Sequence, residues 1–171
     1  MTDPAPAAAP EFTRSVDVNR LPSGESVHDL AAAPAERSAL ARRFDLLALD
    51  RLEAQVRLTP LPGGLVRLSA TLSADLVQAC VVTLEPVPAR IDDQFTLLFR
   101  PGVEEKAVVL SPAAELIEPL PAGILDIGEA VAQQLSLVLD PFPRAPGATA
   151  ASPGEALASP FAALANWKQN N

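Results

Sequence analysis

The sequence holds one cysteine, Cys80, and one histidine, His28, in 171 residues, and it has no tyrosine. A single cysteine forms no intrachain disulfide, and together with one histidine it cannot supply the ligands of a structural zinc site or a four-cysteine cluster. No run approaches the roughly 18 consecutive apolar residues of a membrane span. One tryptophan and six phenylalanines give few rings for stacking against single-stranded nucleic acid. We therefore expect a soluble protein without a metal or other cofactor.

Positive charge is also scarce. The chain has 13 basic and 21 acidic residues, so its formal net charge is −8, which argues against general binding to a phosphate backbone. The acidity is uneven, because residues 101–160 hold 8 acidic and 2 basic side chains. Apolar residues make up 49% of the sequence, which excludes disorder of the whole chain. The composition predicts an acidic globular protein.

The 18 prolines suggest where the folded part begins and ends. Residues 1–10 are mostly Ala and Pro and are predicted to be a disordered lead, and they lack the basic start and apolar segment of a secretory signal. We expect a single domain over residues 11–140, a Pro/Gly/Ala linker over 141–158 and a short helix over 159–171. The expected compartment is the cytoplasm.

Alternating apolar and polar residues give the clearest structural signal. Residues 52–59 and 66–76 both alternate with period two around the turn sequence Pro60–Gly64, which predicts a long antiparallel hairpin with one wet face. A third strand is expected over 89–99, where Asp93 interrupts the apolar face. A short apolar strand is predicted over residues 78–84, and two weaker strands over 12–20 and 25–31 could form an edge hairpin.

Helices are fewer than strands. Pro34 suits a first helical position, so a helix is predicted over 34–43. Asp126 with Glu129 three residues later resembles a capping box, and the apolar stripe that follows predicts a helix to Leu139. The sequence predicts an α+β fold with two or three helices packed on a mostly antiparallel, strongly twisted sheet, with a barrel-like curl as one option.

Residues able to carry out catalysis are few. His28 lies on a predicted edge strand and is expected to be solvated or half-buried, and Cys80 lies in an apolar run typical of a buried, inert thiol. Asp92 and Asp93 are adjacent on a strand and therefore point to opposite faces, so they cannot share a proton. Glu104–Glu105 follow Pro-Gly in a predicted loop. We expect a protein that is not an enzyme.

Two groups of residues could bind a partner. The basic residues of the first helix and the hairpin form local groups no denser than on an ordinary solvated face; they are Arg37, Arg42, Arg43, Arg51, Arg57 and Arg67. Near the C-terminus, Phe161, Leu164 and Trp167 recur at helical spacing after the linker. A short isolated helix is marginal in water, so this stripe is expected to dock either on its own domain or in the groove of a partner.

Short motifs in a fixed order resemble the YceD-like family. They are Phe44-Asp45-Leu46-Leu47, the segment that carries Cys80, Leu84-Glu85-Pro86-Val87, Phe95-Thr96-Leu97-Leu98-Phe99, Ile124-Leu125-Asp126-Ile127-Gly128-Glu129, Leu139-Asp140-Pro141-Phe142-Pro143-Arg144 and Ser159-Pro160-Phe161-Ala162-Ala163-Leu164. The resemblance implies a non-enzymatic factor needed for accumulation of large-subunit (23S) ribosomal RNA and for ribosome biogenesis. Many members carry Cys-x-x-Cys where this chain has Cys80 and Thr83, so no metal or redox role is assigned here.

The acidity and the resemblance together favour a basic partner. We expect a ribosomal protein or a pre-ribosomal particle, with ribosomal RNA affected without tight direct binding, and neither DNA nor a membrane as partner. The candidate partner-binding residues are Arg90, Glu104, Glu105, Arg144, Phe161, Leu164, Trp167 and Lys168. The alternative is a module in which a barrel-like sheet binds an apolar small molecule.

Overall fold

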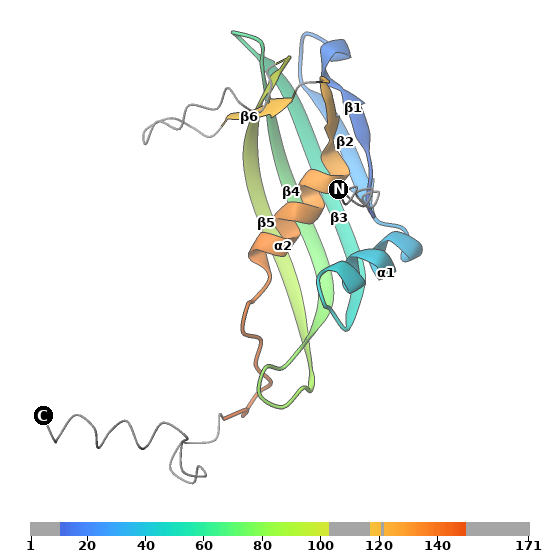
Figure 1. The fold of residues 1–171 in the computed structure, drawn as a ribbon, viewed down its shortest axis with the longest axis vertical. Helices are drawn as coiled ribbons and strands as arrows, with labels where there is room; N and C mark the ends of the chain where they lie inside the picture. Colours follow the sequence, from blue (N-terminus) through green and yellow to red (C-terminus); the bar gives the residue numbers. More distant parts are fainter. Residues whose placement is uncertain (1–10, 103–116, 121, 150–171) are drawn as a thin grey trace, which may run out of the picture.

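Long strands dominate the fold. The computed structural model describes residues 11–102, 117–120 and 122–149. In this part the chain forms a five-stranded sheet in the order β2-β3-β4-β5-β6, a two-stranded sheet of β1 and β7, and two α-helices (Figure 1). The elements are β1 Ser15–Asp17, the 3-10 helix η1 Val18–Arg20, β2 Ser26–Ala31, α1 Pro34–Arg43, β3 Ala48–Leu61, β4 Leu65–Ala79, β5 Pro86–Pro101, β6 Ile117–Leu120, β7 Ile124–Asp126 and α2 Ile127–Val138. The predicted α+β class is confirmed.

The predicted central hairpin is present as β3 and β4. The two strands pair antiparallel, with Leu58 opposite Leu68, and the turn between them contains Gly63 and Gly64, both at positive φ. Glycine suits these positions because it lacks the Cβ that makes a positive φ costly. The apolar half of the alternation is buried, as predicted: Leu52, Ala54, Val56, Leu58, Val66, Leu68, Ala70, Leu72, Ala74 and Leu76.

The sheet is mixed and open. β2 pairs antiparallel with β3, and β5 pairs antiparallel with β4, but the short β6 runs parallel to the end of β5. A barrel requires the first and last strands to pair with each other. Here β2 and β6 have six and four residues, and they remain separate edges. The barrel-like option is therefore wrong, and the predicted antiparallel pairing holds from β2 to β5 but not for β6.

Both predicted helices begin where their capping residues indicate. Pro34 occupies the first turn of α1, and the Glu36 carboxylate accepts a hydrogen bond of 2.7 Å from the backbone N–H of Ala33. Asp126 caps α2, because its carboxylate accepts the backbone N–H groups of Gly128 and Glu129 at 3.1 Å. Figure 1 shows α2 crossing one face of the long strands.

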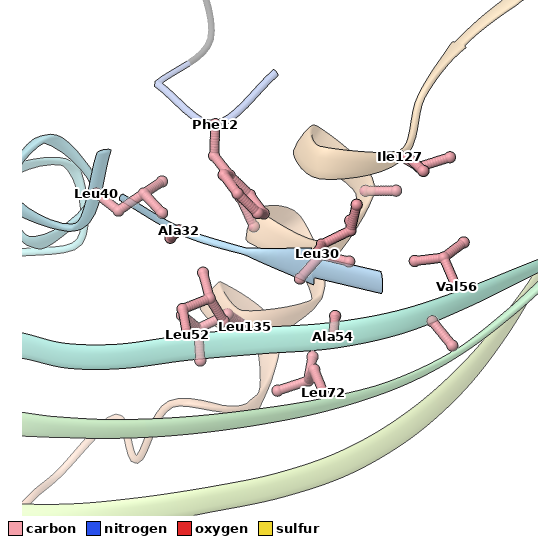
Figure 2. Close-up of a cluster of buried hydrophobic side chains, with 14 of the residues drawn as sticks. Phe12, Leu30, Ala32, Leu40, Leu52, Ala54, Val56, Leu72, Ile127 and Leu135 are labelled. Carbon is pink, nitrogen blue, oxygen red and sulfur yellow. The ribbon is translucent and has the colours of Figure 1, made fainter. Parts of the chain in front are cut away.

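The core lies between that face of the sheet and the helices. Figure 2 shows Leu52 and Ala54 of β3 and Leu72 of β4 on the side where Phe12 and Leu135 lie. Each of these five side chains is less than a tenth exposed. Burial of large aliphatic and aromatic side chains stabilises a fold by about 1.5–3 kcal/mol each, so this layer accounts for the placement of α2 against the sheet.

The N-terminal segment is part of this packing, in a way that the sequence did not predict. β1 pairs with β7, with Val16 opposite Leu125, and does not pair with β2. The predicted edge hairpin is therefore wrong, because the chain turns through η1 and the Val18 N–H donates to the carbonyl of Gly123 at 2.9 Å. Next to β1, the backbone N–H of Arg14 donates to Asp126 Oδ1 at 2.8 Å.

The predicted strand over 78–84 is also wrong. β4 continues to Ala79, and the chain then turns through a loop over 80–85 before β5 begins at Pro86. The Cys80 N–H donates to the Glu85 carbonyl at 2.8 Å, and Leu84 has a φ of 62°. This closed loop joins β4 to β5 as a second hairpin, so the β3–β5 unit is a three-stranded meander.

Candidate functional site

The face of the sheet opposite the helices is polar. We call it the outer face; on it the side chains alternate with the buried ones along β3, β4 and β5. It presents Arg51, Glu53, Gln55, Arg57, Arg67, Ser69, Thr71, Ser73, Asp75, Arg90, Asp92, Gln94 and Thr96. Among the described residues, no helix or strand covers this face. The wet face predicted for the hairpin thus extends across four strands and is available to a partner.

A hollow of about 900 Å³ lies on the outer face, across β2, β3, β4 and β5. Its lining includes three carboxylates on separate strands, those of Asp29, Glu53 and Asp92. The other lining residues are Leu30, Ala31, Ala54, Gln55, Thr71, Leu72, Ser73, Asp93 and Gln94. No arginine or lysine is among these residues, so the hollow is acidic, and we call it the acidic groove.

A hydrogen-bonded network holds one rim of the acidic groove. Arg51 Nε donates to Asp75 Oδ2 at 2.7 Å, and Arg51 Nη1 donates to Glu53 Oε2 at 3.1 Å. Arg51 Nη2 also donates to the Ser73 hydroxyl at 2.9 Å. The hydrogen bond from Arg51 lowers the pKa of Asp75 below its ordinary value. The guanidinium therefore fixes polar side chains of β3 and β4 relative to one another.

The network continues onto β5 through Ser73. The Ser73 hydroxyl donates to Asp92 Oδ1 at 2.6 Å, and Arg90 Nε donates to Asp92 Oδ2 at 2.9 Å. These two bonds, first that of Ser73 and then that of Arg90, lower the pKa of Asp92. Asp92 is therefore ionised at neutral pH, and its carboxylate is held in one orientation at the groove.

Asp92 and Asp93 have different roles, as the alternation predicted. Asp93 borders the groove, but its carboxylate accepts a hydrogen bond of 2.8 Å from Gln134 of α2, on the helix side of the sheet. Asp92 and Asp93 thus lie on opposite faces of β5, and they do not form an acid–base pair.

The third carboxylate of the groove, that of Asp29 on β2, accepts a hydrogen bond of 3.0 Å from the Gln55 amide.

Most of the candidate arginines are used within the fold. Arg43 forms ion pairs with Glu129 and Glu11, at 2.7 and 3.0 Å, and Arg57 pairs with Glu25 at 3.2 Å. These pairs neutralise the cations that a phosphate backbone would need. Arg37 bonds the Ala32 carbonyl, while Arg42 and Arg67 form no ion pair within the described part of the chain.

A second site lies where the β4–β5 loop meets the segment that follows α2. The Val81 N–H donates to the Pro143 carbonyl at 2.9 Å, and the Gln78 amide donates to the Asp140 carbonyl at 2.9 Å. Val81, Leu84 and Phe142 are 49%, 76% and 71% exposed. Two distant motifs are therefore brought together, with apolar side chains on their surface.

Cys80 lies inside this junction. Its Sγ accepts the backbone N–H groups of Val82 and Thr83 at 3.4 Å, and the side chain is fully buried. The backbone N–H of Ala145, followed by the hydroxyl of Thr83, lowers the pKa of the Cys80 thiol to about 6, against the effect of burial. The donors favour a thiolate, but burial keeps it from solvent, and no group of three metal-binding side chains occurs among the described residues.

His28 lies on β2, at the edge of the five-stranded sheet, as predicted. It is half-buried, and its Nε2 lies 3.2 Å from the Ser26 hydroxyl. No carboxylate or thiol is bonded to its ring in the described part of the structure, so nothing there assigns it the role of a catalytic base.

Only two of the predicted partner-binding residues lie in the described part of the chain. Arg90 is exposed on β5 at the acidic groove, and Arg144 is exposed on the segment after α2. The other six lie outside the described residues: Glu104, Glu105, Phe161, Leu164, Trp167 and Lys168. The predicted disordered lead, the second half of the linker and the C-terminal helix lie outside them too, and these calls stay predictions.

Sequence reasoning missed the acidic groove itself. Its carboxylates Asp29, Glu53 and Asp92 belong to three strands and meet only through the register of the sheet. The sequence did place Glu53, Ser73 and Asp92 in the polar half of the alternation. In the sheet, Ser73 lies between Glu53 and Asp92. Aligning those polar positions across strands needs the register, which short motifs do not give.

Comparison with known proteins gives one match. The family model described as "Large ribosomal RNA subunit accumulation protein YceD" matches residues 68–168, which include β4 beyond its third residue, β5, β6, β7 and α2. Neither a curated protein nor a solved structure matches the chain. Within the described residues, no helix has the length and apolar character needed to cross a membrane.

Proposed function

The chain belongs to the YceD family of large ribosomal RNA subunit accumulation proteins, and we propose that it promotes accumulation of this RNA as a non-catalytic accessory factor in the cytoplasm. The family match over more than half of the chain carries this proposal. The scarcity of catalytic side chains supports a role in binding, because the single histidine and the single cysteine lie on different elements and neither is bonded to a carboxylate among the described residues.

We propose that the protein acts through a basic ribosomal protein or a pre-ribosomal particle. Its net charge of −8 repels bare RNA at long range and attracts basic proteins. Arg43, Arg51 and Arg57 are paired with carboxylates, which supports a protein partner over bare RNA because these cations are already neutralised. The effect on ribosomal RNA would then follow from the state of a bound protein or particle.

Several surfaces are proposed for this contact. On the described part they are the acidic groove with Arg90 and the loop junction with Arg144. The acidic stretch 101–140 and the Phe161–Lys168 segment complete the proposal, and Phe161, Leu164 and Trp167 are its apolar anchors. Acidic and aromatic side chains are the types that recognise basic protein segments.

Depletion of the protein in cells tests the proposed function. We expect large-subunit ribosomal RNA to fall relative to small-subunit RNA, and affinity capture of the tagged chain to recover large-subunit ribosomal proteins even after nuclease treatment. Unchanged ribosomal RNA after depletion would contradict the function. Capture that is lost with nuclease, together with tight binding of purified protein to bare ribosomal RNA at physiological salt, would contradict the protein partner.

Nothing in the described structure favours the alternative of an apolar small-molecule binder. That alternative depended on a barrel-like sheet, and the sheet is open. The helix side of the sheet is filled by core side chains, while the acidic groove on the other side combines aliphatic residues with carboxylates, amides and hydroxyls. An apolar ligand would leave these polar groups without partners.

A further inference from the structure

We propose that the acidic groove on the outer face binds an extended, lysine- or arginine-rich polypeptide segment of the partner protein. This inference rests on the proposed function and goes beyond it by naming the surface and the chemistry of the bound segment. The groove spans four strands, and the described chain leaves it uncovered.

Charge decides which occupant suits the groove. The carboxylates of Asp29, Glu53 and Asp92 line it, and no arginine or lysine does. Arg51 and Arg90 approach from one rim, where they bond Glu53 and Asp92. Arg51 also bonds Asp75, so the groove and its rim carry four carboxylates against two guanidinium groups, and Asp29 has no cationic partner among the described residues. A nucleic acid would bring its phosphates against three carboxylates, whereas a basic segment would complement them.

The spacing of the carboxylates suits an extended chain. Glu53 on β3, Ser73 on β4 and Asp92 on β5 lie in one row across the sheet. Neighbouring strands are about 4.8 Å apart, so the Glu53 and Asp92 backbones are about 10 Å apart. In the extended polyproline-II conformation, residues three apart lie on the same side of the chain and are about 9 Å apart. Two basic side chains at that spacing can each reach one carboxylate.

The groove is also prepared for polar contacts. Ser73 and Arg90 hold Asp92, and Gln55 holds Asp29, so these two carboxylates are oriented before anything binds. Thr71 and Gln94 lie in the same row as Gln55 and supply a hydroxyl and an amide. Side chains that are already ordered lose less conformational entropy on binding.

Binding of a defined peptide to the full-length protein tests the proposal. The probe is a short capped peptide in which arginine recurs every third residue among serine and glycine, and its control has glutamine in place of arginine. We expect Glu53→Gln with Asp92→Asn to weaken arginine-peptide binding by about tenfold, since each exposed pair contributes about a factor of three. Both substitutions keep hydrogen-bonding oxygens, so the fold should persist.

A matched variant separates the groove from net charge. Asp45→Asn with Asp50→Asn also removes two negative charges, from exposed positions outside the groove, and Asn tolerates the positive φ at position 45. This variant should bind the arginine peptide within about twofold of the unmodified protein. Equal weakening by both double variants would overturn the groove, and so would an unchanged affinity in the Glu53/Asp92 variant.

Local and competing signals complete the test. The side-chain amide NMR resonances of Gln55 and Gln94 should shift with the arginine peptide and stay in place with the glutamine peptide. Shifts caused instead by a single-stranded RNA would overturn the basic-segment occupant. In depleted cells, the Glu53/Asp92 variant should fail to restore large-subunit RNA. Full restoration by this variant would reject the groove and leave the family function intact, because depletion alone tests that function.

Discussion

Arg43 and Glu129 form a two-pronged ion pair that joins α1 to α2. Arg43 Nη1 lies 2.9 Å from Glu129 Oε2, and Arg43 Nη2 lies 2.7 Å from Glu129 Oε1. The two residues are 86 positions apart, so the pair links the two helices on the core side of the sheet. A planar guanidinium matches a carboxylate in this geometry, and a lysine does not.

We predict that Arg43→Lys lowers the free energy of unfolding by about 1 kcal/mol, because one of the two parallel hydrogen bonds is lost while the charge is kept. Arg42→Lys is the matched control, since Arg42 is exposed and forms no ion pair in the described part of the chain. Urea denaturation measures both variants. Equal stability of the two would mean that the pair contributes nothing.

Stability should also depend on pH through Glu129. The hydrogen bonds from Arg43 lower the pKa of Glu129 in the folded state below its ordinary value of 4.5. The unfolded chain therefore binds the proton first, and the stabilisation is present above 4.5 and lost as the pH falls through the folded pKa. Glu129→Gln should reduce the acid dependence of the unfolding free energy, measured by denaturation between neutral and acidic pH. An unchanged slope would contradict the shift.

Gly128→Ala should destabilise the protein although alanine favours helices. A Cβ at position 128 would overlap the backbone carbonyl of Phe12, which passes over the first turn of α2. Alanine in place of a free helical glycine usually stabilises by about 1 kcal/mol, whereas this overlap should cost about 2 kcal/mol net. Thermal unfolding measures the change. The control is Leu137→Ala, at a position of the same helix that is 77% exposed, which should change the stability by less than about 0.5 kcal/mol.

Asp93 should protect the free edge of β5 from self-association. β6 pairs only with residues 98–101, so from Pro86 to Leu97 the outer edge of β5 has no partner strand among the described residues. A charge on the apolar side of an edge strand opposes pairing with another copy. Asp93→Val should therefore produce oligomers in light scattering, without loss of secondary structure by circular dichroism.

The control for that edge is Thr71→Val. Thr71 is exposed on β4, which has a neighbour on both sides, so the new valine adds apolar surface away from any free edge. If this variant oligomerises as strongly as Asp93→Val, added apolar surface explains the effect, and the edge has no special role.

Local patterns predicted the parts of the fold that local physics determines. The alternation in β3 and β4 placed Leu52 and Leu68 in the core, and Asp126 marked the start of α2. The pairing of β1 with β7 depends instead on a contact between residues more than 100 positions apart, such as Arg14 with Asp126. No local propensity encodes such a contact, so the sequence suggested a hairpin with the nearest strand.

The acidic groove could not be predicted from the sequence either, because it also depends on residues from separate strands. Asp92 next to Asp93 already predicted that one carboxylate faces solvent, but not that Glu53 lies in the same row. Register depends on how complete strands align, and a one-residue slip would move Asp92 to the other face. The loop over 80–85 was mistaken for a strand because its apolar residues Val81 and Leu84 are exposed, contrary to the usual preference for burial.

The bond between Arg14 and Asp126 bears on what can be cut from this protein. The family match begins at residue 68, within β4, yet β3 pairs with β4 from Leu65 to Val77, and the N-terminal segment supplies Phe12 to the core. A fragment limited to residues 68–168 would lack β3, so one edge of β4 would have no partner strand. It would also lack Phe12 and α1, which cover the apolar face of the sheet. The segment matched by the family model is therefore shorter than the segment needed for folding, and truncated variants should retain the residues from Glu11 onward.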